Sequence, residues 1–445
     1  MFRSLARKTE PAVALMPPPF LSVHAADACR QDPHLLAGLE AVLPVGRRYE
    51  FAVAALPAPE SRSDSATVPP AAAEFVLSLF NDPEQIDGIA DRVLAARALG
   101  APTTLIVAIN ARQLAALGRW LDRRSAAGRL AGTRLLLARD VADALRQLPD
   151  RLQAVVEDNL IRMPTSSEIE NGSYKSFYVF SPQLQALVAR IRAYAKNGVT
   201  RAYLLGGPGS GKTSLAYYYF LIRSKGRFVS VNLAAENTGD KASIKSLLCG
   251  HVSGAFPGAG ARTGAFTVAR DGVCFIDEAH GVTGGVMETL MEALDNGQYL
   301  PFGASAKQPL ECALLFATNR SWDHLRNSVN IDEFTRLGAA TLSVPELHKR
   351  EEDMIAVTGA LLAKLGSRCT TWQAAAGMTD DAWQAIRECR WHGNIRALTR
   401  VMEAAFVDAG VRGDGSALLD VEDIRNGIAL WEPKDHHSHA VYGTN

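Results

Sequence analysis

The sequence predicts an α/β protein built on a parallel sheet with flanking helices, followed by a helical segment and preceded by a small α/β domain. The main evidence is a glycine-rich loop, Gly206–Ser214, that lies between an apolar run beginning at Tyr203 and a helix-like run. A second apolar run, Val273–Ile276, ends in two carboxylates. Strand-like patterns fade after Glu351, and helix-like patterns continue to about Trp431.

Composition places the chain among ordinary globular proteins. Of its 445 residues, 47% are hydrophobic and 21% are charged, which excludes extended disorder and long coiled coils. Lysine plus arginine (47) equals aspartate plus glutamate (47), so the charge balance does not favour a nucleic-acid coat or a polybasic membrane binder. The six cysteines are scattered without a Cys-x-x-Cys pair, which indicates reduced thiols rather than a disulfide framework or a zinc site.

Targeting segments are not evident in the sequence. No apolar run approaches the roughly 18 residues that a membrane-spanning helix needs. The apolar stretch near the N-terminus is interrupted at Pro11 and Pro17, whereas a signal peptide needs an uninterrupted apolar core. We therefore expect a cytoplasmic protein that does not bind membranes.

Residues 1–165 are expected to form a small α/β regulatory or sensor domain with a partly parallel sheet. Helix-like stretches such as Ala111–Ala127 and Val141–Leu148 alternate with strand-like runs. The strand-like runs are Phe51–Leu56, Phe75–Phe80, Leu105–Ile109 and Leu135–Ala138. The block is locally basic, which leaves two alternatives open: a face for RNA, a nucleotide or another anion, or a solvated helix surface. The arginines concerned are Arg112, Arg119, Arg123, Arg124, Arg129, Arg134 and Arg139.

Composition also sets the remaining boundaries. Turn and polar residues collect in 163–173, so the second domain is expected to begin near residue 171. Ser181 is expected to cap a helix that has Pro182 in its first turn and that runs to about Lys196. We place the second α/β domain at 171–350, a helical lid at 351–431 and a flexible polar tail at 432–445.

The glycine-rich loop matches the Gly-x-x-x-x-Gly-Lys-Thr pattern of a phosphate-binding loop. Glycines in such a loop let backbone N–H groups point toward phosphate oxygens at the N-terminus of a helix. Lys212 is expected to reach the β- and γ-phosphates of ATP, and the Thr213 hydroxyl is expected to bind Mg²⁺. The predicted nucleotide-binding residues of the loop are Gly206, Gly207, Pro208, Gly209, Ser210, Gly211, Lys212, Thr213 and Ser214.

Two further strand ends carry side chains suited to catalysis. Asp277 and Glu278 follow the second apolar run, and ligand sites in open α/β sheets lie at the carboxyl ends of strands. Asp277 is expected to hold Mg²⁺ directly or through water, and Glu278 to orient and deprotonate the attacking water. A third apolar run ends in Thr318 and Asn319, and either side chain is a candidate to read the γ-phosphate or to hold that water.

Together these motifs resemble the AAA+ domain of bacterial enhancer-binding proteins, the activators of sigma-54 RNA polymerase, over about residues 178–431. Phe228–Ala235 resembles the family segment whose asparagine, here Asn232, contacts the catalytic glutamate. An exposed phenylalanine between glycines also indicates a partner, the alternative being a buried turn residue. The segment that resembles the family's partner-binding GAFTGA loop is Gly254, Ala255, Phe256, Pro257, Gly258 and Ala259.

The resemblance also implies roles for two arginines. Asp332–Leu337 resembles the arginine-finger segment, so Arg336 is expected to reach the nucleotide of a neighbouring subunit. Trp391–Leu398 resembles the sensor II motif, so Arg396 is expected to contact the nucleotide from the lid. Arginine suits both roles because its guanidinium binds phosphate bidentately and stays charged when partly buried.

Three features differ from the family pattern. Pro257 replaces the loop threonine that contacts sigma-54 in the family, and proline has neither a hydroxyl nor an N–H. Asn330 stands where the family usually has a first arginine, a role for which Arg326 is a candidate. No helix-turn-helix pattern follows the lid, so no DNA-binding domain of its own is evident.

The resemblance implies a homo-oligomeric ring, expected to be a hexamer, that uses ATP and Mg²⁺ and remodels sigma-54 RNA polymerase by ATP hydrolysis. Two alternatives stay open. The same ATPase could act on a different protein client, for example in stress or phage defence, which Pro257 and the missing DNA-binding domain suggest. The chain could instead be an ATP-gated sensor scaffold with little turnover, for which Asn330 is the evidence.

Overall fold

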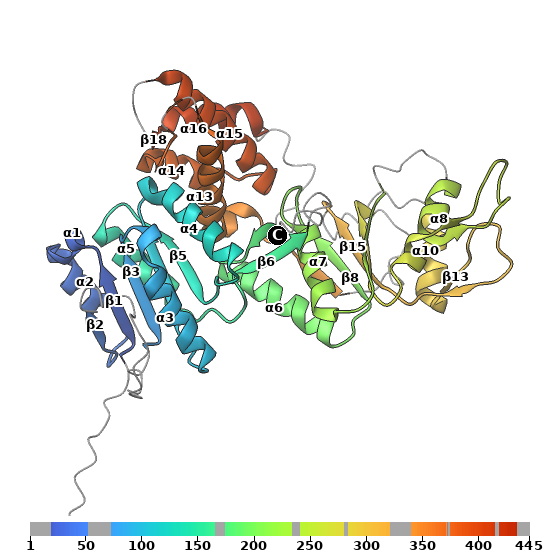
Figure 1. Ribbon diagram of the computed structural model, residues 1–445, viewed down its shortest axis with the longest axis horizontal. Coiled ribbons are helices and arrows are strands. Elements are labelled where there is room, and N and C mark those ends of the chain that lie inside the picture. The colour runs from blue at the N-terminus through green and yellow to red at the C-terminus, as the bar shows by residue number, and fades with distance from the viewer. Residues whose placement is uncertain are drawn as a thin grey trace, which may run out of the picture.

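The computed structural model describes residues 19–51, 73–164, 174–233, 241–279, 284–320, 340–370, 372, 374–413 and 418–433. These residues form an N-terminal α/β domain, a second α/β domain and a helical lid (Figure 1). The molecule is elongated in this view, and the lid lies above the junction of the two α/β domains. Parallel sheets with flanking helices confirm the predicted fold class.

The N-terminal sheet has the strand order β2-β1-β3-β4-β5, and all neighbouring strands in it are parallel. The prediction of a partly parallel sheet is therefore wrong; this strand order is one of the common doubly wound arrangements. Of the strand expected over Phe51–Leu56, only Phe51 is described, where it is the last residue of β2, and residues 52–72 lie outside the described part. The strands are β1 (Leu21–Ala25), β2 (Tyr49–Phe51), β3 (Phe75–Leu79), β4 (Thr104–Ile109) and β5 (Thr133–Leu137).

Successive side chains of the central strands point to opposite faces of this sheet, and both faces are apolar. Leu105 and Val107 of β4 pack on one side with α3 and α4, whereas Ile106 and Ala108 pack on the other side with α2 and α5. The expected helix from Ala111 begins instead as a 3-10 turn. The helices are α1 (Asp27–Arg30), α2 (Pro33–Val42), α3 (Asp87–Ala98), α4 (Leu114–Ala126) and α5 (Val141–Gln147).

The second sheet has the order β16-β8-β15-β12-β9 and is also parallel. Helices α6 and α7 cover one face, and α8, α9 and α10 cover the other. The strands are β8 (Arg201–Leu205), β9 (Phe228–Asn232), β12 (Val273–Asp277), β15 (Ala313–Thr318) and β16 (Ala340–Ser343). The helices are α6 (Pro182–Lys196), α7 (Lys212–Arg223), α8 (Lys241–Cys249), α9 (Ala265–Val268) and α10 (Gly284–Asn296).

An antiparallel pair, β6 (Leu160–Pro164) and β7 (Tyr174–Tyr178), connects the two α/β domains. Helix α6 follows it over the predicted range, with Ser181 at the N-cap position. The Ser181 hydroxyl makes no capping hydrogen bond to α6, contrary to the prediction; it accepts a hydrogen bond from the backbone N–H of Asp353 at 3.2 Å. Ser181, which was expected to cap α6, therefore binds the first turn of α13 instead.

The lid consists of α13 (Glu351–Arg368), α14 (Asp380–Glu388), α15 (Asn394–Arg412) and α16 (Val421–Trp431), joined by the short strands β17 (Gly377–Met378) and β18 (Leu418–Leu419). Helices α15 and α16 pack side by side, and α13 packs on α4 of the N-terminal domain (Figure 1). Among the described residues, no helix is both long enough and apolar enough to cross a bilayer.

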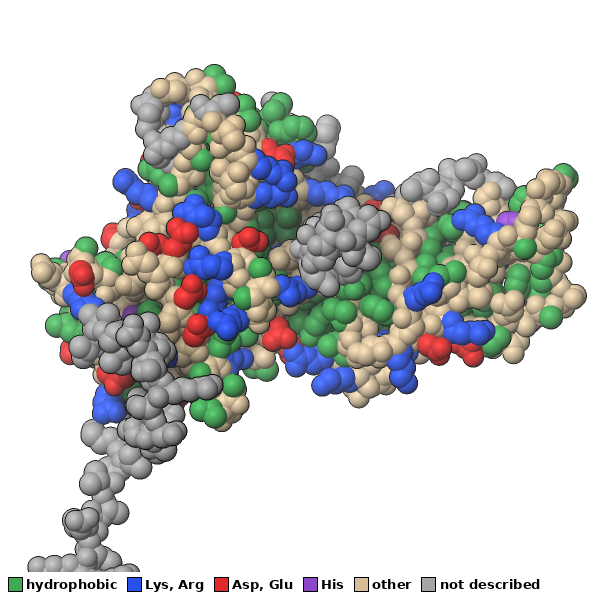
Figure 2. Space-filling view, in the orientation of Figure 1, with side chains coloured by type: hydrophobic (Ala, Val, Ile, Leu, Met, Phe, Trp, Pro, Cys, Tyr) green, Lys and Arg blue, Asp and Glu red, His purple; other side chains and the backbone are tan. Residues whose placement is uncertain are grey.

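Most of the N-terminal arginines singled out from the sequence form ion pairs, and two of them, Arg124 and Arg134, are buried. Figure 2 shows Lys and Arg side chains lying beside Asp and Glu side chains on the face that carries α3 and α4. Most of these guanidinium groups already pair with a carboxylate. Little unpaired positive charge is therefore left for an anionic ligand. The pairs are Arg119–Glu84, Arg123–Asp87, Arg124–Asp91, Arg129–Asp91, Arg134–Glu352 and Arg139–Asp143.

The first turn of α13 buries a carboxylate that titrates in an unusual range. Asp353 accepts hydrogen bonds from the backbone N–H groups of Phe180 at 2.6 Å and of Ser181 at 3.4 Å. Burial raises the pKa of Asp353 to about 6, although Arg350 and these hydrogen bonds oppose the shift. The folded protein therefore binds this proton more tightly than the unfolded chain does.

We predict that Asp353→Asn changes how stability depends on pH. Because the folded-state pKa lies above the unfolded value, Asp353 makes the free energy of unfolding fall by up to about 3 kcal/mol as the pH rises from about 4 to about 6. An asparagine keeps an oxygen for the Phe180 N–H but does not titrate. Urea denaturation at about pH 4.5 and pH 7 measures the effect; equal pH dependence of both proteins would contradict it.

Candidate functional site

The phosphate loop connects the end of β8 to the start of α7. Lys212 is the first residue of α7, and its buried Nζ donates hydrogen bonds to the carbonyl oxygens of Gly206 at 2.9 Å and Gly207 at 3.1 Å. Burial lowers the pKa of Lys212, whereas the nearby carboxylates of Asp277 and Glu278 oppose this shift. The structure thus brings the predicted lysine and both predicted carboxylates into one site.

Strand order explains how residues distant in sequence meet there. Strand β15 lies between β8, which leads into the phosphate loop, and β12, which ends at Asp277. The tip of β15, Thr318 and the following Asn319, therefore lies between the loop and the carboxylates, and the N–H of Gly206 donates to the Thr318 carbonyl at 3.2 Å. On the outer side, Asn232 pairs in register with Asp277.

Two side chains at this sheet edge have features of a functional site. Glu278 has a φ of +54°, in the left-handed region that non-glycine residues rarely adopt, and its N–H bonds to the Asp277 side chain at 3.0 Å. The Oδ1 atom of Asn319 is buried and has no hydrogen-bond partner within the described part of the chain. A buried acceptor without a donor fits a site that receives water or a ligand.

The lid closes on the phosphate loop through direct backbone contact. Gly209 has a φ of +67°, and a Cβ there would lie 2.5 Å from the carbonyl oxygen of Gly393. The Asn394 side chain links the two parts, because its amide donates to Pro208 at 3.1 Å and its oxygen accepts from the Leu347 N–H at 2.8 Å. Arg396, in the same turn of α15, is exposed and also lowers the pKa of Lys212 by its charge.

Sequence reasoning did not assign functions to two residues in this contact. Asn394 lies inside the segment that resembles the sensor II motif, which was a usable signal. Arg350 is almost fully buried, and its guanidinium donates a hydrogen bond to the carbonyl oxygen of Ser210 at 2.9 Å. An arginine before a run of acidic residues is common on protein surfaces. The sequence pattern alone therefore did not indicate that Arg350 binds the phosphate loop.

The predicted partner loop lies at the end of the molecule farthest from the N-terminal domain (Figure 1). It rises from the antiparallel pair β10 (Gly250–His251) and β11 (Arg262–Thr263). At its tip the Ala259 N–H bonds to the Phe256 carbonyl at 3.0 Å, and Gly258 has a φ of +81°. These values match a type II turn with Pro257 in the second position and glycine in the third.

Phe256 is exposed within this turn. Its side chain is 43% exposed, and hydrophobic side chains are visible at this end of the molecule in Figure 2. Its ring lies against His251, with 4.9 Å between centroids, and against Phe302 at 6.3 Å. The alternative of a buried turn residue is therefore wrong.

Three residues discussed from the sequence, Arg326, Asn330 and Arg336, lie outside the described residues. Thr213 and Ser214 lie in the first turn of α7, beside Lys212. The described part of the chain therefore includes the predicted phosphate-loop, strand-tip and lid residues, but not the predicted arginine finger.

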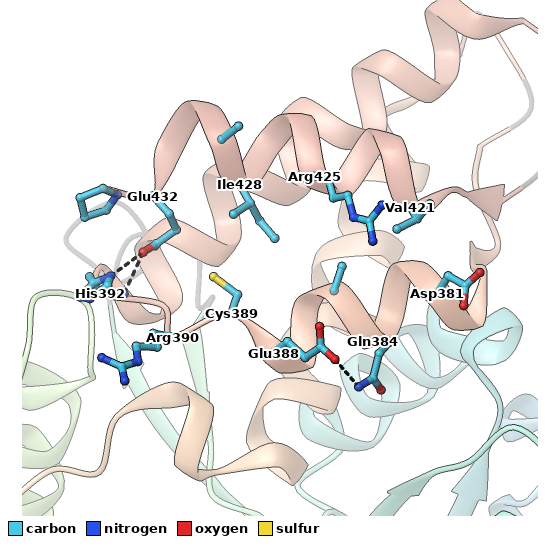
Figure 3. Close-up of a pocket in the computed structure, with 13 residues that line it drawn as sticks. Asp381, Gln384, Glu388, Cys389, Arg390, His392, Val421, Arg425, Ile428 and Glu432 are labelled. Carbon is cyan, nitrogen blue, oxygen red and sulfur yellow. Dashed lines mark hydrogen bonds and ion pairs between the residues drawn. The ribbon is translucent and has the colours of Figure 1, made fainter. Parts of the chain in front are cut away.

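A separate groove of about 760 Å³ lies between α14 and α16 of the lid. Figure 3 shows Glu432 at one end of it, where the carboxylate accepts hydrogen bonds from the backbone N–H of His392 at 3.0 Å and from the His392 ring at 3.1 Å. Acidic and basic side chains both line the groove, among them Glu388 and Arg425. It contains none of the residues predicted to bind nucleotide.

Residues 178–343 match the family model of the sigma-54 interaction domain. The matched segment is less than half of the chain. It contains the phosphate loop, the carboxylates at the end of β12 and the Phe256 loop, so the resemblance inferred from the motifs is confirmed.

Relatives of known name align with about half of this chain. A nitric oxide reductase transcription regulator, NorR1 of Cupriavidus necator, is 33% identical over 249 residues, 53% of this chain and 46% of the relative. A Nif-specific regulatory protein of Herbaspirillum seropedicae is 29% identical over 239 residues, 52% of this chain and 43% of the relative. The chain therefore spans about half the length of these curated relatives. A structure of NtrX from Brucella abortus with ADP aligns over 94% of this chain and 87% of its own, at 18% identity and a TM-score of 0.49.

We predict that Gly209→Ala disturbs the lid contact, whereas Gly198→Ala does not. Both glycines have positive φ values, so each alanine costs about 1 kcal/mol of backbone strain, but only the Cβ at position 209 meets the lid. Thermal unfolding should therefore show a larger loss of stability for Gly209→Ala. Equal losses in the two variants would contradict this lid contact.

Proposed function

We propose that the chain is an ATP-hydrolysing AAA+ protein that remodels sigma-54 RNA polymerase to activate transcription. The observation that carries the proposal is the exposed Phe256 on a defined turn inside the segment that matches the sigma-54 interaction domain. The names of the relatives, which include transcription regulators, support the same role.

The chemistry proposed for the site is hydrolysis of the terminal phosphate of ATP. Lys212 binds the phosphates, and the Thr213 hydroxyl and Asp277 would hold Mg²⁺. Glu278 orients and deprotonates the attacking water. The proximity of Asp277 and Glu278 to Lys212 and the buried Asn319 acceptor support this assignment, because a water at the strand tip could donate to Asn319.

The active unit proposed is a ring of identical subunits, with a hexamer as the expected size. Arg336 would reach the nucleotide of the neighbouring subunit, and Arg396 would contact the nucleotide from the lid of its own subunit. The exposed position of Arg396 beside the phosphate loop supports the second role, because its side chain is free to turn toward a phosphate.

We predict that Glu278→Gln binds ATP but loses at least about a hundredfold in hydrolysis rate, because glutamine cannot accept the proton of the attacking water. Lys212→Ala should lose nucleotide binding. Phosphate release and binding of a fluorescent ATP analogue measure the two effects separately. A Glu278→Gln variant that hydrolyses ATP at the normal rate would contradict the catalytic assignment.

We predict that Phe256→Ala abolishes capture of sigma-54 in the presence of ADP and aluminium fluoride, which traps the hydrolysis state. The matched control is Leu221→Ala, which truncates a side chain of similar exposure (41%) on α7, far from the loop. Native mass spectrometry measures the complex. Capture that is unaffected in Phe256→Ala would contradict a recognition role for this loop.

A second candidate is an ATPase with the same chemistry and a different protein client. Pro257 favours it, because proline cannot offer the hydroxyl that the resemblance leads us to expect at this position. Efficient ATP hydrolysis by the wild-type protein without any capture of sigma-54 would select this candidate.

A further inference from the structure

The N-terminal domain and the lid share one hydrophobic core. Side chains from α4 and from β4 and β5 of the N-terminal sheet belong to the same buried cluster as side chains from all four lid helices. Trp120 and Leu121 of α4 and Met354 of α13 are fully buried in it. Two domains that meet only transiently keep separate cores, whereas a continuous core indicates one packed unit.

Helices α4 and α13 cross at two glycines, Gly118 and Gly359. A Cβ on Gly118 would overlap the carbonyl oxygen of Gly359, and a Cβ on Gly359 would lie 2.8 Å from the carbonyl oxygen of Leu114. A backbone hydrogen bond of 2.9 Å, from the Ala115 N–H to the Ala376 carbonyl, joins the same surfaces. The crossing is therefore a backbone contact that has no room for larger residues.

A buried ion pair joins the two parts beside this crossing. The Arg134 side chain of β5 is 3% exposed and the Glu352 side chain of α13 is 2% exposed. Arg134 holds both carboxylate oxygens, with a distance of 2.9 Å from Nε to Oε2, and the Leu135 N–H donates to Oε2 at 3.0 Å. Such a bidentate geometry compensates two charges that are otherwise unfavourable away from water.

The helical turn that carries Glu352 also carries the contact to the phosphate loop. Arg350, at the N-cap of α13, donates to the Ser210 carbonyl, and Asp353 holds the N–H groups of Phe180 and Ser181. A shift of this turn toward or away from the N-terminal domain would therefore move its bond to the phosphate loop.

We propose that the N-terminal domain is docked constitutively on the lid, and that Arg134, through Glu352, is a positioning residue for the phosphate loop. The lid and the N-terminal domain then move as one body when nucleotide binds. The part that concerns nucleotide rests on the proposed function, whereas the docking itself does not.

The first test compares Gly118→Ala with Gly88→Ala in the full chain. Both glycines lie in helices of the N-terminal domain, but a Cβ at position 88 meets nothing within 4 Å, whereas the atoms nearest to one at position 118 belong to α13. We expect Gly118→Ala to bind a fluorescent ATP analogue about tenfold more weakly, and Gly88→Ala to bind like the wild type. Wild-type affinity in Gly118→Ala would overturn the link between the docking and the phosphate loop.

The second test is a double-variant cycle on the ion pair, measured below the unfolding temperature of each variant. Arg134→Met leaves the buried Glu352 with only the Leu135 N–H and a longer contact of 3.6 Å to the Nε of Arg151, so we expect nucleotide affinity to fall about tenfold. Adding Glu352→Met removes this poorly compensated charge, and we expect affinity to recover to within about threefold of the wild type. Unchanged affinity in Arg134→Met, or no recovery in the double variant, would overturn the positioning role.

Thermal unfolding separates this proposal from the proposed function. If the wild type binds no nucleotide, the proposed function fails, and the docking is then judged by calorimetry alone. Docking predicts that the N-terminal domain and the lid unfold in one transition, which Gly118→Ala shifts to lower temperature and Gly88→Ala does not. Separate transitions in the wild type, or equal shifts in the two variants, would overturn the docking.

Discussion

The structure depends on how three charged side chains are buried in one helical turn. Arg350, Glu352 and Asp353 all lie at the start of α13 and are almost inaccessible to solvent. Buried charges destabilise a fold unless each finds a partner, and these partners come from three different parts of the chain. Glu352 binds the N-terminal sheet, Asp353 binds the start of α6, and Arg350 binds the phosphate loop. The turn therefore fixes the relative positions of these parts.

The geometry of the predicted nucleotide site depends on this junction and on the strand order of the second sheet. The lid touches the phosphate loop at Gly209 through Gly393, while β15 separates the loop from the carboxylates of β12. A strand is about 5 Å wide, so the inserted strand holds the phosphate loop and the carboxylates of β12 apart. Asn319 follows the tip of the inserted strand, which places its buried oxygen between the phosphate loop and these carboxylates.

The local sequence pattern was enough to predict much of this arrangement. It did not predict which residues far apart in the sequence pair with one another. The loop before Lys212 and the acidic end of β12 were readable because spacing and apolar runs are properties of short segments. The placement of Asn319 needed the order of strands, which only the fold supplies. The shared core and the pairing of Arg134 with Glu352 join residues more than two hundred positions apart, so nothing near Arg134 in the sequence distinguishes it from a surface arginine. A sequence does not distinguish a buried arginine from an exposed one, because the difference lies in the residue that the arginine contacts in the fold.

The same reasoning changes the meaning of Pro257. In the turn from Phe256 to Ala259, the hydrogen bond uses the N–H of Ala259, so a proline at the second position removes no bond that the turn needs. Proline and the positive φ of Gly258 instead restrict the loop to the turn that exposes Phe256. A partner that binds this tip must recognise the aromatic ring and the backbone, because no hydroxyl is present at position 257. The difference from the family pattern therefore changes the chemistry of the loop tip while the ring of Phe256 stays exposed.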